Sequence, residues 1–316
     1  MITQLFTPKT AIRTAGLTLA ASIFTLTLAS GAQAIEPRST PQITFTMPKE
    51  PVYGSILVNH QDWAKLRPAT GTITLYFLEK IEFRATEELA KHPEVLDQLP
   101  NNNLIGLMLD SCKLGDKELQ RVSKFPNLSK LSLKSTNITD AFLATAAKLA
   151  SLKELDISHT GINGSGLFHL AKLSKLQTLE INSTKIAPDK LSQIDKLKSL
   201  TSLNVRQIGL TDDGLVAISK LKNLKVLKLG ENPMLSDNGI TSLERLKQLR
   251  LLDITGTRIS HKAIAAMHFP KLQMIAVTRQ QLRKNGLAIL TNAYPGILIC
   301  PGDTDEQIDS AFQLPY

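Results

Sequence analysis

The sequence predicts an α/β solenoid, a stack of repeated strand–turn–helix units. Two observations predict this fold. Apolar residues recur with a period of 24 residues from Leu104 onward, with single-residue slips between 224 and 272. Within each unit the apolar spacing changes from alternation, which is typical of a half-buried strand, to steps of three, which are typical of a helix. One unit buries too little apolar surface to fold alone, so the units must stack and both ends need caps.

The units can be aligned by their first apolar residue. These residues are Leu104, Leu128, Leu152, Leu176, Leu200, Leu224, Leu249 and Leu272, with a truncated last unit at Ile297. Positions 4 and 6 are aliphatic in every complete unit, as in "LKELDISHTGI" at residues 152–162. Position 11 is aliphatic again, and positions 16, 19 and 22 then continue at helical spacing. Each unit is therefore expected to be a short strand, a turn and a helix.

Hydroxyl–acid pairs occupy the point in the unit where the helix is expected to begin. They are Thr139-Asp140, Thr211-Asp212 and Ser236-Asp237. Side-chain oxygens at a helix start accept from free backbone N–H groups, and a carboxylate there favours the positive end of the helix. We interpret these pairs as helix caps.

The pattern L-x-x-L-x-L-x-x-T-x-I-T-D-x-G-L-x-x-L-x-x-L-x-x resembles the leucine-rich repeat family, in particular the 24-residue bacterial-type repeats with Thr or Cys at position 9. The resemblance covers residues 104–303 and implies a curved horseshoe with its parallel strands on the concave face and its helices on the convex face. Ile208, Asn232 and Gln280 replace Thr at position 9, and Ala187-Pro188 replaces Thr-Asp. Side-chain hydrogen bonds between units are expected to be interrupted there.

Residues 1–34 have the three-part pattern of a secretory signal peptide. They contain no acid, carry Lys9 and Arg13, and end an apolar stretch at Ala32-Gln33-Ala34. That stretch has about 15 apolar residues, fewer than the roughly 20 needed to span a bilayer. We expect cleavage after Ala34, export to the periplasm or cell exterior, and no integral membrane segment in the mature chain.

The remaining chain is divided by composition and pattern. Residues 35–70 are interpreted as a linker and N-terminal segment, because prolines and polar residues dominate 35–51. Residues 71–103 keep a degenerate strand-then-helix pattern and are expected to form an N-terminal capping repeat. Residues 104–303 are the regular repeats, and 304–316 are expected to be a C-terminal lid or tail.

The two cysteines are expected to be free. Cys112 and Cys300 fall eight strands apart in the predicted stack, at position 9 of the first unit and position 4 of the last. At a strand spacing of about 4.8 Å this separates them by roughly 38 Å. A disulfide tolerates only about 7 Å between Cα atoms.

Composition narrows the chemistry. Aromatic residues are only 5% of the chain, so the core must be aliphatic, and the net charge is +9, or +7 without the signal.

A row of cations recurs at position 21: Lys124, Lys148, Lys172, Lys196, Lys220 and Arg245. Cations are favoured at helix C-terminal ends, so we interpret the row as structural, with binding of an anionic polymer as the alternative. No aromatics interleave it for stacking, which argues against nucleic acid. The six histidines lack metal-ligand spacing, and no cofactor motif is present.

The candidate binding residues lie on the concave face, toward which positions 3, 5, 7 and 8 point. Position 5 is polar in the middle of the stack and apolar at its ends. The candidates are Asp156, Glu180, Asn204, Arg206, Lys228 and Asp253. Asp156 and Glu180 would lie one strand apart, and adjacent like charges indicate either a site for a cationic or hydroxylated ligand or a solvated sheet face.

The leading hypothesis is a monomeric, non-enzymatic exported protein that binds a protein or glycan partner on its concave face. One alternative is a structural envelope protein without a specific ligand. Another is an enzyme with its site in the N-terminal segment, where His60, Asp62, Trp63 and His92 are the candidates outside the repeats. That segment is small for a catalytic domain.

Overall fold

The computed structural model describes residues 42–59, 64–76 and 78–302 of the 316-residue chain. By its contacts the chain divides into residues 1–40 and 41–316, and the described residues all belong to the second unit. The predicted signal peptide and C-terminal lid or tail lie outside the described residues, as do His60, Asp62 and Trp63. Among the residues that are described, no helix has the length and apolar character needed to cross a bilayer.

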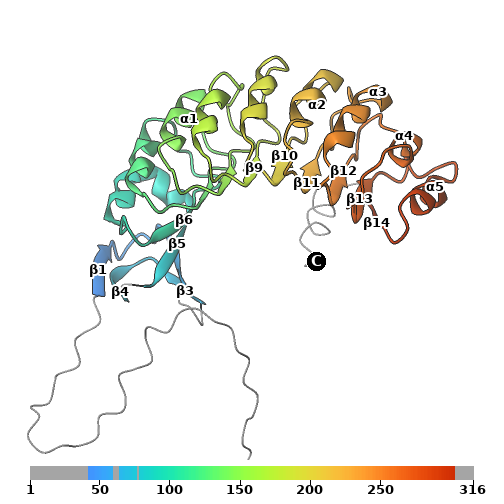
Figure 1. Ribbon diagram of the computed structural model, residues 1–316. Coiled ribbons are helices and arrows are strands. Elements are labelled where there is room, and N and C mark those ends of the chain that lie inside the picture. Colours follow the sequence, from blue (N-terminus) through green and yellow to red (C-terminus); the bar gives the residue numbers. More distant parts are fainter. Residues whose placement is uncertain (1–41, 60–63, 77, 303–316) are drawn as a thin grey trace, which may run out of the picture. The chain divides into compact units, whose positions relative to one another are not determined.

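The second unit is a solenoid of strand–turn–helix units built on a long sheet, as predicted. Its strand order within the described residues is β14-β13-β12-β11-β10-β9-β8-β7-β6-β5-β2-β3. The repeat strands are β6 (Leu104–Met108), β7 (Lys130–Ser132), β8 (Glu154–Asp156), β9 (Thr178–Glu180), β10 (Ser202–Asn204), β11 (Val226–Lys228), β12 (Leu251–Asp253), β13 (Met274–Val277) and β14 (Leu298–Pro301). From β5 to β14 neighbours pair in parallel. Within this unit the strands lie on the inner side of the arc and the helices on the outer side (Figure 1).

The strand register follows the repeat. Leu131 of β7 pairs with Leu155 of β8, and Leu155 pairs with Leu179 of β9, so position 4 forms one buried row. The register differs from expectation only at the last strand, where Cys300 pairs with Ala276 and therefore occupies position 5. Both cysteines are free, as predicted. Cys112 is buried, and this burial, with the charges of Asp110 and Glu87, raises the pKa of its thiol to about 11.

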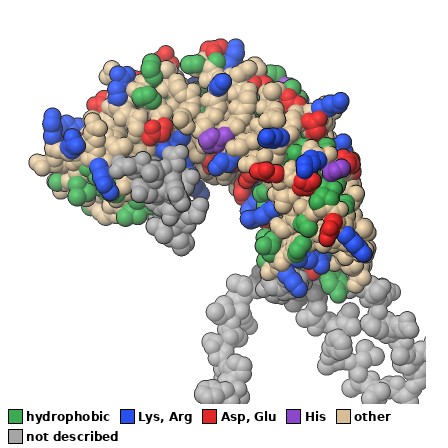
Figure 2. All heavy atoms as spheres, turned by 180° about the vertical axis from the view of Figure 1, so that it is seen from behind, with side chains coloured by type: hydrophobic (Ala, Val, Ile, Leu, Met, Phe, Trp, Pro, Cys, Tyr) green, Lys and Arg blue, Asp and Glu red, His purple; other side chains and the backbone are tan. Residues whose placement is uncertain are grey.

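The convex segments are a mixture of short α-helices and 3₁₀ helices. The α-helices are α1 (Asp140–Ala146), α2 (Asp212–Ile218), α3 (Asp237–Ile240), α4 (His261–Ala265) and α5 (Gly286–Ala293). The 3₁₀ helices are η1 (Glu87–Lys91), η2 (Pro93–Gln98), η3 (Glu118–Lys124), η4 (Leu167–Lys172), η5 (Lys190–Lys196) and η6 (Thr241–Arg245). The three-residue spacing from Leu167 to Leu170 and Leu173 keeps these buried side chains on one face of a helix with three residues per turn. Lysine and arginine, aspartate and glutamate are interspersed on the face seen in Figure 2.

The N-terminal cap is larger than the predicted capping repeat and begins inside the predicted linker. Strand β1 (Gln42–Met47) pairs antiparallel with β4 (Gly71–Tyr76), and β2 (Gly54–Asn59) lies between β3 (Ala64–Pro68) and β5 (Lys80–Ala85). The prediction of a linker at 42–47 was therefore wrong. The alternation of Ile43, Phe45 and Met47 with polar residues was the signal, and the neighbouring prolines obscured it. Strand β5 then pairs in parallel with β6 and closes the open end of the repeat sheet.

The predicted cap pairs act mainly on the next unit rather than on their own helix. Asp140 accepts hydrogen bonds from the backbone N–H groups of Asn163 and Gly166, both at 2.7 Å. Asp212 accepts from Ser236, through the backbone N–H at 2.9 Å and the hydroxyl at 2.6 Å. The hydroxyls of Thr139 and Ser236 do accept from their own helices, at 3.4 and 3.3 Å. Thr211 makes no side-chain cap bond. The aspartates thus join successive units.

Position 9 also differs from expectation. Thr136, Thr160 and Thr184 donate their hydroxyls to the carbonyl three residues earlier, at 2.6–2.7 Å. Ile208 has no hydroxyl, but the amide of Asn232 in the next unit donates to the carbonyl of Val205, at 2.8 Å. The departures at 208 and 232 therefore compensate each other, because the Val205 carbonyl still receives a side-chain hydrogen bond.

Position 8 adopts a left-handed backbone that the sequence analysis did not predict. The non-glycine residues are Ser111, Ser135, His159, Ser183, Gln207 and Glu231, with φ between 51° and 61°. Gly256 occupies the same position with φ 62°. The glycine at this position was the one sequence signal for the left-handed backbone, because glycine adopts positive φ without a steric penalty.

We expect Ser135→Gly to stabilise the protein by about 0.5–1 kcal/mol, because it removes the clash of a Cβ atom in the left-handed region. Ser135 is exposed, so the change removes little packing. Denaturant unfolding would measure the effect. Ser135→Ala is the matched control, since it removes the hydroxyl but keeps the Cβ atom, and equal midpoints for the two variants would contradict the prediction.

Candidate concave binding site

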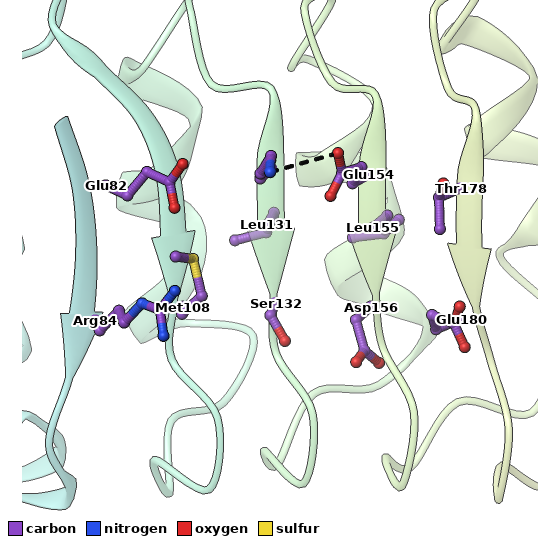
Figure 3. Close-up of a pocket in the computed structure, with 11 residues that line it drawn as sticks. Glu82, Arg84, Met108, Leu131, Ser132, Glu154, Leu155, Asp156, Thr178 and Glu180 are labelled. Carbon is purple, nitrogen blue, oxygen red and sulfur yellow. Dashed lines mark ion pairs between the residues drawn. The ribbon is translucent and has the colours of Figure 1, made fainter. Parts of the chain in front are cut away.

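The concave face carries a pocket of about 350 Å³ over strands β5 to β9. It is lined by Glu82, Arg84, Met108, Lys130, Leu131, Ser132, Glu154, Leu155, Asp156, Thr178 and Glu180. Figure 3 shows these side chains in two rows, Glu82, Glu154 and Thr178 in one, and Arg84, Met108, Ser132, Asp156 and Glu180 in the other. The two rows are positions 3 and 5 of the repeat, on either side of the buried leucine at position 4.

The cap contributes one end of this pocket. Glu82 and Arg84 come from β5, which is aligned with Gly106 and Met108 of β6. A methyl group at Gly106 would lie 2.7 Å from Cγ of Glu82, so the missing side chain at position 3 provides the space that the Glu82 side chain occupies. The pocket is therefore built jointly by the cap and the first regular repeats.

Carboxylates outnumber cations in the pocket, with Glu82, Glu154, Asp156 and Glu180 against Arg84 and Lys130. Lys130 Nζ lies 3.7 Å from Glu154 Oε1, and both side chains are about half exposed, so this ion pair contributes little to stability. The excess of negative charge suits a cationic group of a ligand.

Asp156 is the most constrained carboxylate of the pocket. Its Oδ1 accepts from the backbone N–H of Ser158 at 2.9 Å and from the Ser158 hydroxyl at 2.6 Å. Burial raises the pKa of Asp156, the nearby charge of Asp110 raises it further, and the bonds from Ser158 partly offset both effects. The carboxylate is thus held in a fixed orientation and is protonated at a higher pH than an ordinary aspartate.

A model of the leucine-rich repeat region matches residues 102–286, which is more than half of the chain. The chain belongs to the leucine-rich repeat family. Among solved structures it is similar to an internalin from Listeria monocytogenes, at 18% identity over 69% of this chain and 70% of that chain, with a TM-score of 0.47. It is also similar to the plant peptide hormone receptor RGFR1 in complex with RGF2, at 22% identity over 55% of this chain and 32% of that chain, with a TM-score of 0.39. No curated protein matches the sequence significantly.

Of the residues that the sequence analysis selected in this leucine-rich repeat protein, Asp156 and Glu180 line the pocket. Asn204, Arg206, Lys228 and Asp253 lie farther along the same face, on or just after β10, β11 and β12, and do not line it. The predicted position-5 column is present, because Glu180 pairs with Asn204, Asn204 with Lys228, and Lys228 with Asp253. The pocket brings together only the first part of that column.

Three of the selected residues are buried and bonded within the protein, which the sequence analysis did not anticipate. Asn204 Oδ1 accepts from the backbone N–H of Arg206 at 3.1 Å. Arg206 forms an ion pair with Asp253, and its Nη1 donates to the hydroxyl of Thr255 at 2.9 Å. Asp253 is fully buried, and its Oδ1 also accepts from the backbone N–H and the hydroxyl of Thr255. These contacts give the three residues a structural role in the repeat stack.

Arg206 reaches Asp253 by crossing the intervening repeat. A methyl group at Gly230 would lie 2.2 Å from Arg206 Nη1 and 2.7 Å from Asp253 Oδ2. Gly230 occupies position 7, as Arg206 does, so the glycine leaves the gap through which the guanidinium passes. The sequence signal for this contact was the run of position-7 residues in three successive units, Arg206, Gly230 and Thr255.

The residues that sequence analysis missed are those from the cap, those at position 3, and Met108 and Ser132 at position 5. Glu154 and Thr178 are at position 3, which was expected to face the concave side but was not selected. Arg84 and Glu82 could not be selected, because the alignment of β5 with the repeats depends on the register shift between Ile81 and Glu82.

The remaining candidates are placed elsewhere. His92 packs edge-on against Tyr53 at 5.8 Å and lies 3.1 Å from Glu94, outside the concave pocket. In the basic row, Lys124 pairs with Asp97 at 2.8 Å and Lys220 with Asp195 at 3.0 Å. No cluster of three or more metal-ligating side chains occurs among the described residues.

Proposed function

We propose that this leucine-rich repeat protein is an exported, non-enzymatic binding protein whose concave pocket holds a basic segment of a protein partner. The observation that carries the proposal is the pocket over β5 to β9, with four carboxylates and two cations on adjacent strands. The N-terminal pattern that ends at Ala34 supports export. A basic peptide would place a lysine or arginine side chain between the two rows of carboxylates.

The arrangement of the pocket favours recognition of an extended partner. Its polar side chains project from paired strands, which fixes their spacing before a ligand binds and reduces the ordering cost of association. Asp156 is further fixed by Ser158. Met108 adds an apolar contact between Arg84 and Ser132 (Figure 3). An aliphatic side-chain stem with a cationic end fits this combination.

A random peptide library displayed on phage and selected on the folded protein is expected to yield sequences enriched in lysine and arginine. Glu154→Gln/Glu180→Gln should weaken binding of a selected peptide by about tenfold, because it removes two charges that face the cationic group. Glu87→Gln/Asp213→Asn is the matched control, since it removes two exposed acids from η1 and α2 on the helical face. Enrichment of acidic or apolar peptides, or equal weakening by the control, would contradict the proposal, and no enrichment at all would favour the structural envelope protein.

The pH dependence provides a second readout for the same peptide. Because burial raises the pKa of Asp156, this carboxyl takes up its proton earlier than an ordinary aspartate as the pH falls. Peptide affinity should therefore begin to fall at a pH above the ordinary aspartate range, and Asp156→Asn should remove this early part of the decline.

A further inference from the structure

A second and larger pocket lies among the loops that follow β12 and β13, at the end of the solenoid opposite the cap (Figure 1). Its volume is about 840 Å³, within the range of small-molecule sites. It is lined by Gly256, Thr257, Arg258, Ile259, Ser260, His261, Thr278, Gln280, Gln281, Arg283 and Lys284. None of these residues lines the concave pocket.

The lining is basic without compensation. Arg258, Arg283 and Lys284 are exposed at the pocket, and no acid is among its described lining residues. The sequence from 254 to 302 contains six lysines and arginines and no aspartate or glutamate. The next acids, Asp303, Asp305, Glu306 and Asp309, lie outside the described residues.

The three cations have no partner of their own among the described residues. Within the described part of the chain, the side chains of Arg258, Arg283 and Lys284 make no hydrogen bond or ion pair, whereas Lys124 and Lys220 each pair with an aspartate. A cleft lined by charges of one sign raises the local concentration of counter-ions, so three cations at one cavity favour the binding of an anion.

The acids that touch the pocket wall are already engaged elsewhere. Asp237 accepts from the backbone N–H and hydroxyl of Ser260, at 2.6 and 2.8 Å. Glu231 lies against Gly256, where a methyl group would be 2.4 Å from its Oε1, and it is 3.9 Å from the guanidinium of Arg206. Neither acid pairs with the three cations.

The pocket is held in shape by bonds among its other polar residues. Gln281 Oε1 accepts from the backbone N–H of Thr278 at 2.8 Å, and its Nε2 donates to the carbonyls of Ile254 and Ile259 at 3.0 and 2.9 Å. His261 is buried, and its Nδ1 lies 2.7 Å from the carbonyl oxygen of Gln281, so Nδ1 carries the proton. These bonds fix the two loops while leaving the three cations available.

We propose that this pocket binds the phosphate or sulfate group of a sugar ester, with the oxyanion contacted by Arg258, Arg283 and Lys284. Guanidinium and ammonium groups are the side chains that bind such oxyanions, and arginine adds paired N–H donors in a fixed plane. The volume exceeds that of an inorganic anion, which favours an anion attached to a sugar ring. Phosphate and sulfate esters share this chemistry, so the experiment must separate them.

Isothermal titration of the full chain with glucose 6-phosphate and glucose 6-sulfate tests the proposal, with inorganic phosphate, inorganic sulfate and glucose as reference probes at constant ionic strength. We expect at least one ester to bind more tightly than its inorganic anion and glucose not to bind. Arg283→Gln/Lys284→Asn should weaken ester binding by about tenfold or more, because it removes two charge-assisted contacts. Asparagine is chosen at 284 because Lys284 has φ 57° and asparagine tolerates this conformation.

The matched control is Lys172→Gln/Lys196→Asn, which removes the same charge from exposed sites on the basic row. Retained ester binding in this control, with loss in the pocket variant, would support the proposal. Equal loss in both variants would overturn it in favour of nonspecific attraction to net charge. Absence of ester binding to the unmodified protein, or esters no tighter than the inorganic anions, would also overturn it.

Discussion

Replacing Asn232 by alanine is expected to lower the free energy of unfolding by about 3–5 kcal/mol, because several buried backbone groups lose their partners at once. Asn232 is fully buried. Its Nδ2 donates to the carbonyls of Val205 and Leu229 at 2.8 and 2.7 Å. Its Oδ1 accepts from the backbone N–H groups of Ile208 and Leu210 at 3.2 and 2.9 Å. Urea unfolding followed by circular dichroism would measure the loss.

Thr160→Ala is the matched control at the same position of another unit. Thr160 makes one hydrogen bond, to the carbonyl of Ile157 at 2.6 Å, so its loss should cost about 1 kcal/mol. A more specific test is the pair Ile208→Thr/Asn232→Thr, which restores a hydroxyl at both positions. We expect this pair to be more stable than Asn232→Thr alone, because the hydroxyl introduced at position 208 would donate to the Val205 carbonyl that the shortened side chain at 232 no longer reaches. If Ile208→Thr did not improve Asn232→Thr, the two departures would not compensate each other.

Replacing Arg206 by alanine is expected to cost about 3–5 kcal/mol, because it leaves the carboxylate of Asp253 buried without its cation. Asp253 is fully buried and Arg206 is 4% exposed, so the ion pair is shielded from water in the folded protein. Thr255 would still donate to Asp253 Oδ1, at 2.9 Å from the backbone N–H and 2.7 Å from the hydroxyl. The same unfolding measurement applies.

Two further variants test whether the lost stability comes from leaving a buried charge unpaired. Lys130→Ala removes an exposed cation from the pair with Glu154 and should cost at most about 1 kcal/mol. Arg206→Met/Asp253→Leu removes both charges and should be more stable than Arg206→Ala, because no buried charge is left unpaired. A small loss for Arg206→Ala, similar to that of Lys130→Ala, would show that the buried ion pair does not carry the stability assigned to it.

The buried ion pair of Arg206 and Asp253 changes how the concave face is interpreted. The sequence analysis treated Asn204, Arg206 and Asp253 as exposed binding residues. The structure gives them internal partners, so loss of ligand binding in their variants would have to be separated from loss of folding. Glu154 and Glu180 are better probes of binding, because they line the pocket on strands whose leucines form the core.

The sequence by itself determined the repeat, the strand register over β6 to β13 and the face to which each position points. These follow from the 24-residue period, because a strand with a buried leucine at position 4 must expose positions 3 and 5. The same alternation fixed Asp156 and Glu180 on adjacent strands of the concave face. Periodicity was sufficient because each unit contacts its nearest neighbours in the same way.

The tertiary structure alone decided the features that depart from the period. The cap begins at β1 because Gln42–Met47 finds a partner in β4, a pairing between segments about 30 residues apart that no repeat specifies. Arg206 reaches Asp253, two units further along, because Gly230 in the unit between them has no side chain. Asn232 donates to the carbonyl of Val205, because Ile208 lacks a hydroxyl that could do so. Each contact depends on the length of one side chain and on the space left by another in a neighbouring unit. A period describes what the units share, and these contacts arise from the residues in which the units differ.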